Sequence, residues 1–247
     1  MTTAKDWNVL VPEKNRLVTP NKNERKSSAG LPTHIVIHVT GTNNLSSVTK
    51  TFLDDHSVSA HYLVTKEGVL YQFAPDGYRA WHAGIDSGAR SLYNQGAQHW
   101  MKYLKFFKWY KGYPKDAVYV DVDLNPVWDE TEAAFVRRAD GQIWSEYDYF
   151  VNRWPGENQP VNFAQDPDPN NYSIGIETLG FGAKSADPAV YTDAMYQSLA
   201  QLVSDLSKKY EIPMEKGRVV GHEDVNPIGR FGWDPAPGFD WSTVRKS

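Results

Sequence analysis

The chain has 247 residues, of which 40% are hydrophobic and 23% charged, a composition typical of a globular protein with a sizeable core. Its formal net charge of −4 argues against nucleic acid as the main partner, because binding to the phosphate backbone requires a basic surface. The absence of cysteine excludes disulfides, thiolate metal ligands and a cysteine nucleophile.

The first 32 residues are predicted to form an N-terminal arm that ends in the polar segment TPNKNERKSSAGLP. The N-terminal stretch MTTAKDWNVLVPEKNRL lacks the continuous apolar region of a cleaved signal peptide, and no apolar run long enough to span a membrane occurs. We therefore expect synthesis in the cytoplasm without a signal peptide, no membrane span, and another route for any action outside the cytoplasm.

A single domain is predicted over residues 33–247, and its first part alternates between strands and a helix. HIVIHVTG is an apolar, β-branched run typical of a buried strand. In SSVTKTFLDDH, Val48 and Phe52 lie four residues apart behind a serine cap, which predicts a short helix. Two β-rich runs flank residues 66–68, Lys-Glu-Gly, and this pattern predicts a hairpin.

Residues 86–171 differ from the flanking segments in composition and residue pattern. We interpret them as a large aromatic-rich insertion between elements of that one domain. HWMKYLKFFKWYKGYP has aromatic residues at helical spacing with lysines between them. AFVRRADGQIWSEYDYF is typical of a hairpin that turns at residues 140–141, Asp-Gly. The aromatic side chains suit a small core, a glycan-stacking surface, an extension of a substrate groove or a docking face for an inhibitor.

After the insertion, YSIGIETLGFG is a second buried-strand pattern and RVVGH is a short strand. Between them lies the clearest helix of the chain, with Thr192 as its N-cap and Pro213 beyond its end. Its apolar face is formed by Leu199, Leu202, Val203 and Leu206. The alternation of strands and helices predicts the α/β class, with a central mixed β-sheet flanked by helices.

Two of the 7 histidines, His38 and His222, stand where an apolar strand gives way to glycine and polar residues. A catalytic zinc ion takes three protein ligands and keeps one position open for water. Taken singly, each histidine is more often a hydrogen-bonded structural residue, and Asp234 before proline reads as a turn former. Spacing alone does not join these three residues.

Six segments nevertheless resemble, in the same order, the zinc-dependent N-acetylmuramoyl-L-alanine amidases. They are VIHVTGT, SAHYLVTKEGVLYQFAP, RAWHAG, NYSIGIETLG, VGHEDVNPIGR and DPAPGFDW. The family includes enzymes of peptidoglycan recycling, phage lysozyme-like amidases and peptidoglycan recognition proteins. The resemblance covers roughly residues 33–85 and 172–245 and leaves the insertion unmatched.

The resemblance implies one Zn²⁺ ion as cofactor, held by His38 in VIHVT, His222 in VGHED and Asp234 in DPAPGFDW. It implies that Glu177 in SIGIETLG is the catalytic carboxylate, which takes a proton from water and passes it to the leaving amine. A solvated glutamate at a strand end is the alternative for Glu177. Many members carry a lysine two residues before the third ligand, where this chain has Gly232.

In place of that lysine, Arg230 is the candidate for the positive charge near the developing oxyanion. The alternative for Arg230 is an ordinary surface arginine without a catalytic role. RAWHAG matches a segment that lines the substrate groove, so Arg79, Trp81 and His82 are candidates for substrate binding. Packing is the alternative for Trp81. Val39 occupies the position after the first ligand, where recycling enzymes that prefer anhydromuramoyl fragments carry asparagine, and this favours intact cell wall as substrate.

The expected function is that of a zinc-dependent peptidoglycan hydrolase that cleaves the amide between N-acetylmuramic acid and the L-alanine of the stem peptide. A lytic role is expected, as a phage lysin or an exported antibacterial toxin that acts on the bacterial cell wall or in the periplasm after delivery. Its partners would be peptidoglycan or muropeptide and, for a toxin, an immunity or inhibitor protein. The alternatives are a non-catalytic peptidoglycan-binding module, a cytoplasmic muropeptide-recycling amidase, and a zinc hydrolase acting on another amide.

Overall fold

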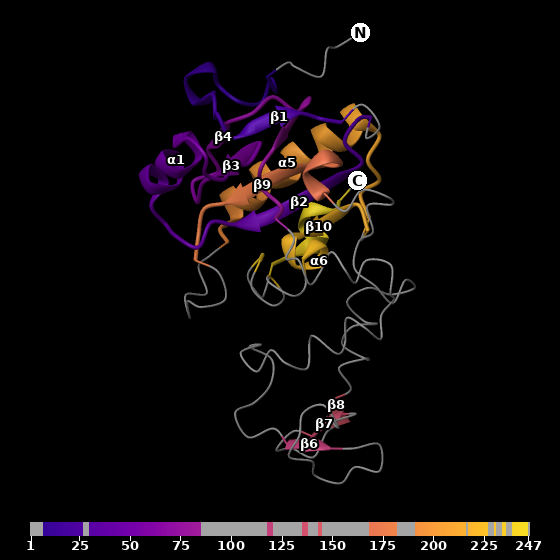
Figure 1. Cartoon of the computed structure of the whole chain (residues 1–247). Helices are drawn as coiled ribbons and strands as arrows, with labels where there is room; N and C mark the ends of the chain where they lie inside the picture. Colours follow the sequence, from indigo (N-terminus) through magenta and orange to yellow (C-terminus); the bar gives the residue numbers. More distant parts are fainter. Residues whose placement is uncertain are drawn as a thin grey trace.

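A five-stranded mixed β-sheet forms the centre of the fold (Figure 1), with the strand order β10-β2-β9-β3-β4. Strands β10, β2, β9 and β3 run parallel to one another, and β4 pairs antiparallel with β3. Their bounds are β10 Val219–Gly221, β2 His34–Val39, β9 Ser173–Thr178, β3 Tyr62–Val64 and β4 Leu70–Gln72. The predicted α/β class with a mixed sheet is confirmed.

The computed structural model describes the central sheet and the helices that cover it. It describes only part of the remaining chain. The described residues are 7–26, 30–84, 118–120, 135–137, 143–144, 168–181, 191–215, 217–226, 230, 234–235 and 239–246. None of the helices within these residues is both long and apolar enough to cross a membrane.

The two faces of the sheet carry different chemistry because side chains alternate along each strand. Ile35 and Ile37 of β2 and the isoleucines Ile174 and Ile176 of β9 belong to the main hydrophobic core. The alternate residues of β2, which include His38, point to the opposite face. That second face therefore offers polar side chains on rigid backbone.

Helix α5 (Asp193–Tyr210) covers the apolar face and is confirmed as predicted. The Thr192 side chain caps its first turn by accepting a hydrogen bond from the backbone N–H of Met195 at 3.1 Å. The helix ends at Glu211, which adopts the left-handed conformation with φ 56°. The side chains it buries in the core are Met195, Leu199, Leu202, Val203, Leu206 and Tyr210.

Helix α1 (Leu45–Leu53) packs over part of the opposite face. Its Val48 and Phe52 are buried against Leu63 and Phe73, as the spacing predicted. The predicted serine cap is wrong, because Asn44 caps the helix by accepting a hydrogen bond from the Ser47 N–H at 3.0 Å. Asparagine is as good a cap as serine, and the sequence offers both side by side.

The segment expected as an N-terminal arm lies against the domain over its described residues. Val11 is fully buried in the main core. Strand β1 (Lys22–Glu24) pairs antiparallel with β5 (Tyr78–Ala80), and the short helix η1 (Glu13–Asn15) precedes it. The Arg25 guanidinium donates hydrogen bonds to the carbonyl oxygens of Asn171 at 2.9 Å and Ser173 at 2.9 Å, which ties this segment to the start of β9.

Within the segment expected as an insertion, three strands form an antiparallel sheet in the order β6-β7-β8. They are β6 (Val118–Val120), β7 (Phe135–Arg137) and β8 (Ile143–Trp144). The pairing of β7 with β8 confirms the predicted hairpin, and the antiparallel pairing of β3 with β4 confirms the earlier one. The lysine- and aromatic-rich helix predicted around residues 99–114 lies outside the described residues.

Two buried histidines outside the candidate site predict acid sensitivity. Burial, helped by the charge of Arg218, lowers the pKa of His34 to about 3, and burial together with Arg25 lowers the pKa of His61 to about 3. Their neutral forms stabilise the fold above the ordinary histidine pKa, and this stability is lost as the pH falls from about 6.5 towards 3.

We expect the free energy of unfolding to fall over this window by up to about 1.4 kcal/mol per pH unit for each histidine. Urea unfolding of the metal-free protein at several pH values would measure this slope. A His34→Gln variant, which cannot take up the proton, should show a shallower slope. Parallel curves for the two proteins would contradict the prediction.

Candidate functional site

Three neighbouring parallel strands, β10, β2 and β9, lie side by side in the sheet (Figure 1). A candidate residue stands at or directly after the carboxyl end of each. His38 of β2 is the register partner of Glu177 of β9. His222 directly follows β10 and begins the short helix α6 (His222–Val225). The carboxyl ends of parallel strands are the usual place for ligands in α/β sheets, because the strands hold the backbone rigid while loops leave space.

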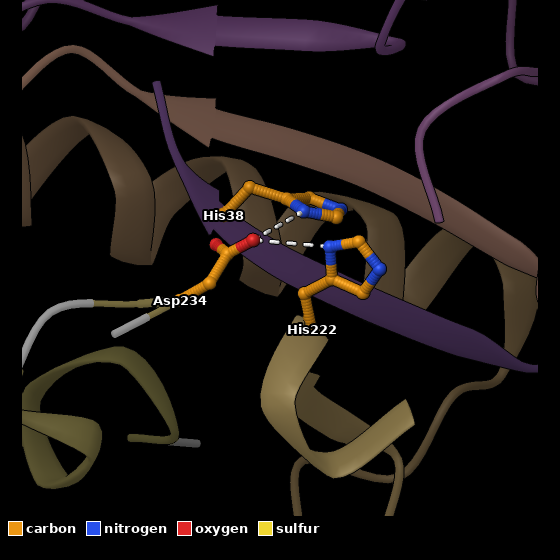
Figure 2. Close-up of side chains that lie close together, drawn as sticks. All are labelled: His38, His222 and Asp234. Atoms are coloured by element: carbon orange, nitrogen blue, oxygen red, sulfur yellow. Dashed lines mark hydrogen bonds and ion pairs between the residues drawn. The ribbon is translucent and has the colours of Figure 1, made fainter. Parts of the chain in front are cut away.

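Asp234 reaches the same edge from the C-terminal segment, where backbone hydrogen bonds hold it. The Val39 N–H donates to Asp234 Oδ1 at 2.9 Å, and the Glu223 N–H donates to the Asp234 carbonyl at 2.9 Å. The other carboxylate oxygen, Oδ2, lies 3.0 Å from His222 Nδ1 and 3.7 Å from His38 Nδ1 (Figure 2). All three side chains are buried, and one ligand atom from each lies within 4.8 Å of the others.

Gly221, the last residue of β10, lets the Asp234 segment approach this closely. A Cβ atom at this position would lie 2.5 Å from Cδ of Pro235 and 3.2 Å from the Asp234 carbonyl oxygen. Such contacts are far below van der Waals distance, so any side chain would push the Asp234 segment away from the histidines.

We expect Gly221→Ala to weaken zinc binding by about tenfold or more, in the range seen when the supports of metal ligands are disturbed. Competition with a colorimetric chelator would measure the affinity. Gly217→Ala is the matched control, because a Cβ there meets nothing within 4 Å. Equal affinities for the two variants would show that the close approach is not needed.

The hydrogen bonds of the His222 ring show which of its nitrogens faces the Asp234 carboxylate. His222 Nε2 lies 3.1 Å from the carbonyl oxygen of Gly84, which can only accept a hydrogen bond. Nε2 therefore donates to this carbonyl, and Nδ1 is the nitrogen that faces Asp234 Oδ2. These two atoms are 3.0 Å apart, so a proton or a metal ion must lie between them.

The donor set of these residues fits a divalent metal such as zinc. Two imidazole nitrogens and one carboxylate oxygen are the ligands of many catalytic zinc sites, which keep a further position open. Burial lowers the pKa of His38 to about 4, so this ring is neutral at neutral pH. Burial alone would raise the pKa of Asp234, but hydrogen bonds and charge from His222 and His38 lower it below its usual value, so Asp234 stays ionised.

Glu177 brings a second carboxylate to the edge of this cluster. The residue is partly exposed, but its Oε2 atom is buried and has no hydrogen-bond partner among the described residues. Burial, reinforced by the negative charge of Asp234, raises the pKa of Glu177 well above its usual value. A buried carboxylate without a partner is costly, and such a group is a candidate for proton transfer.

Arg230 lies at the border of the site. Its Nη1 atom is 4.0 Å from Asp234 Oδ2, and its side chain is 37% exposed. The guanidinium therefore adds positive charge to the site from the solvent side.

A cavity of about 240 Å³ opens beside the cluster. His38, His222, Asp234, Glu177 and Arg230 all line it. Its other wall is formed by the end of β2, the β2–α1 connection, α1 and the segment after α1, and it combines apolar residues with residues that carry hydroxyl groups. These residues are Val39, Thr40, Thr42, Ser47, Val48, Thr51, Phe52, Val58 and Ser59, and His82 also contributes. A substrate in this cavity would meet the His38–His222–Asp234 cluster, the Glu177 carboxylate and the Arg230 guanidinium together.

The three residues expected to bind substrate lie in different surroundings. Arg79 forms an ion pair with Asp168 at 2.6 Å, and Trp81 Nε1 donates to Asn23 Oδ1 at 2.5 Å. Neither Arg79 nor Trp81 is among the residues that line the described cavity. His82 is buried beside His38, with 3.0 Å between its Nδ1 and His38 Nε2.

The amino-acid sequence of the chain also matches a known protein family. Residues 28–237 match the N-acetylmuramoyl-L-alanine amidase family. The chain belongs to this family.

Curated relatives are 1,6-anhydro-N-acetylmuramyl-L-alanine amidases named AmpD. The one from Salmonella typhimurium is 30% identical over 131 residues, which cover 51% of this chain and 64% of the relative. The one from Escherichia coli is 40% identical over 76 residues, which cover 31% of this chain and 37% of the relative. The matches thus span less than two thirds of these relatives' own length.

The family fold is also found in solved structures. A crystal structure of a selenomethionine AmpD derivative aligns with a TM-score of 0.54 and 21% identity, over 98% of this chain and 96% of that one. At this identity the similarity supports the α/β fold of the amidase family.

Sequence reasoning missed several residues that support the site. Gly84 accepts hydrogen bonds from His222 Nε2 at 3.1 Å and from Asn226 Nδ2 at 3.0 Å. Asn226 lies four residues after His222, so its spacing on a helical turn was a usable signal. The contact of Ser173 with His82, described below, had no signal in the sequence because it joins distant segments.

Proposed function

We propose that this member of the family is a zinc-dependent hydrolase of the amide between N-acetylmuramic acid and the L-alanine of the stem peptide. The observation that carries the proposal is the buried cluster of His38, His222 and Asp234, which opens onto the same cavity as the carboxylate of Glu177. Family membership and the names of the relatives support the bond that is cleaved.

In this mechanism His38, His222 and Asp234 hold one zinc ion, which when bound supplies Lewis-acid activation of water and of the scissile carbonyl. Glu177 takes a proton from the attacking water, and its raised pKa makes its carboxylate a stronger base. The same carboxyl group then gives the proton to the amine of L-alanine as it leaves. Arg230 places positive charge near the oxygen on which negative charge develops.

Turbidity of a purified cell-wall suspension tests this proposal. We expect clearing by the zinc-loaded protein, no clearing with a chelator present, and recovery when zinc is added back. Mass spectrometry should find stem peptides with a free L-alanine amine and no new reducing sugar ends. Sedimentation of the protein with wall material without any clearing would instead favour a non-catalytic peptidoglycan-binding module.

We further propose a lytic role on intact cell wall, in which the protein acts on the wall or in the periplasm after delivery by another route. Val39, one of the residues of the cavity lining, supports this reading because the resemblance places asparagine at that position in recycling members. For an exported toxin, an immunity or inhibitor protein is the matching partner.

Recycling of 1,6-anhydromuramoyl fragments is the second candidate, favoured by the names of the curated relatives. The two roles separate in the ratio of kcat/KM for soluble 1,6-anhydromuropeptide to the rate on intact wall. A strong preference for the anhydro fragment would reject the lytic role.

We also propose that residues 1–32 are an arm and that the domain of residues 33–247 carries an insertion at about 86–171 which helps to engage the wall. A deletion that tests this should keep Asp168–Asn171, because Asp168 pairs with Arg79 and the Asn170 side chain accepts hydrogen bonds from the N–H groups of His82 and Ala83. We expect the deletion to slow cleavage of intact wall more than cleavage of soluble muropeptide. Equal effects on both substrates would remove the insertion from wall recognition.

A further inference from the structure

His82 is buried beside the metal-ligand candidate His38 and contributes to the lining of the same cavity. We propose that His82 is a positioning residue that holds the His38 ring with Nδ1 directed at the metal, in place of the substrate contact expected from the sequence. The inference rests on the metal site of the proposed function but not on the identity of the substrate.

A short chain of hydrogen bonds determines the direction of the contact between the two rings. The Ser173 hydroxyl donates to the Pro169 carbonyl oxygen at 2.7 Å, so its single proton is used there. Its oxygen, 3.2 Å from His82 Nε2, therefore accepts the proton of that nitrogen. His82 Nδ1 is then the nitrogen without a proton in the neutral, buried ring.

The consequence for His38 follows directly. Because His82 Nδ1 can only accept, His38 Nε2 must donate across the 3.0 Å contact. Its Nδ1 is left with a free lone pair, 3.7 Å from Asp234 Oδ2. The carbonyl of Gly84 does the same for His222, so His82 and Gly84 of the RAWHAG segment orient both imidazoles toward one point.

The His82 ring is itself held in place from several sides. It packs on the backbone of β9 at Gly175, where a Cβ atom would lie 2.3 Å from His82 Cγ. The Asn170 side-chain oxygen accepts hydrogen bonds from the N–H groups of His82 at 3.1 Å and of Ala83 at 2.8 Å. The His61 ring meets it edge-on with centroids 5.6 Å apart. A residue that is 8% exposed and held in this way is suited to orienting a ligand of the metal.

Two substitutions at His82 separate orientation from simple packing. His82→Phe keeps the ring volume but removes the acceptor, whereas Asn in place of His82 keeps an acceptor oxygen near the position of Nδ1. We expect His82→Phe to weaken zinc affinity by about 10- to 100-fold, the usual effect of losing an outer-shell partner, and His82→Asn to restore most of it. His34→Phe, on the same strand face as His38 and also buried, is the matched control and should bind zinc like the wild type.

Zinc affinity by chelator competition and the visible absorption of the Co²⁺-substituted protein are the two readouts. A changed Co²⁺ spectrum in His82→Phe, with a spectrum close to wild type in His82→Asn, supports a change at His38. An unchanged zinc affinity of His82→Phe together with a raised KM for muropeptide would overturn the proposal, because it would show direct substrate contact.

A measurement on the wild-type protein covers the case in which His82→Phe does not fold. In the zinc-loaded protein labelled with ¹⁵N-histidine, the imidazole nitrogen shifts should show a protonated Nε2 on His38 and an unprotonated Nδ1 on His82. A protonated Nδ1 on His82 would overturn the proposal. These readouts do not use muropeptide, so failure to cleave the muramoyl amide would leave them intact, whereas a wild-type protein without zinc affinity would reject the metal site and this inference together.

Discussion

Glu177→Gln is expected to lower hydrolysis of cell wall by about two orders of magnitude or more while zinc remains bound. The amide has nearly the same size as the carboxyl group but cannot take up a proton from water. Glu177 is not one of the three clustered residues, so the affinity for zinc should change little. Release of soluble peptide from purified wall, measured together with zinc content, checks both parts.

The fold should tolerate this change. Burial raises the pKa of Glu177, so the ionised form is disfavoured in the folded protein, and a neutral amide removes that cost at neutral pH. We therefore expect a Tm for the metal-free variant that is at least as high as that of the wild type. Glu67→Gln, in the β3–β4 hairpin, is a control for the loss of one carboxylate, and near-normal cleavage by Glu177→Gln would remove Glu177 from the mechanism.

Asp234→Asn is expected to lower zinc affinity by more than about 100-fold and to abolish hydrolysis. The amide oxygen can still accept the hydrogen bond from the Val39 N–H, so the segment should stay in place. The negative charge that balances the cation is lost, because Asp234 is ionised in the native protein. Isothermal titration with zinc and the wall-clearing assay measure the two effects.

Asp240→Asn makes the same chemical change six residues further along, where the carboxylate caps α8 (Trp241–Val244) by accepting from Ser242 N–H at 2.9 Å. We expect this variant to bind zinc normally and to keep α8 capped, because asparagine is as good an N-cap as aspartate. Zinc binding by Asp234→Asn equal to that of the wild type would show that the carboxylate is not a ligand.

Much of the fold could be predicted from local patterns. The alternation of apolar residues in HIVIHV and the helical spacing of Leu199, Leu202 and Leu206 are properties of a strand and a helix, whatever surrounds them. The hairpin at Gly68 was equally readable, because its φ of +77° is easy for glycine. The cap of α1 was not, because asparagine at position 44 and the serines that follow are comparable caps and only the chain path before the helix decides between them.

The candidate site was likewise predictable from the sequence only in part. Residue types at strand ends, together with the resemblance of six short segments to a known family, pointed to His38, His222, Asp234 and Glu177. The candidacy of His82 for substrate binding came from the same segments, and the structure adds that the His82 ring lies against Ser173 and Gly175. Nothing in RAWHAG indicates this, since the partners lie on a strand about ninety residues further along the chain.

The sequence by itself determined which segments become strands and helices and which side chains are able to bind a metal, because both are properties of residue type and of spacing over a few positions. Only the tertiary structure decided that the ends of β10, β2 and β9 meet and that the Asp234 segment passes close over Gly221. It also decided which nitrogen of each imidazole faces inward. The physical reason is that the imidazole nitrogen facing away from the metal site donates its proton to a hydrogen-bond acceptor, which leaves the other nitrogen to face the site. The packing of remote segments supplies that acceptor.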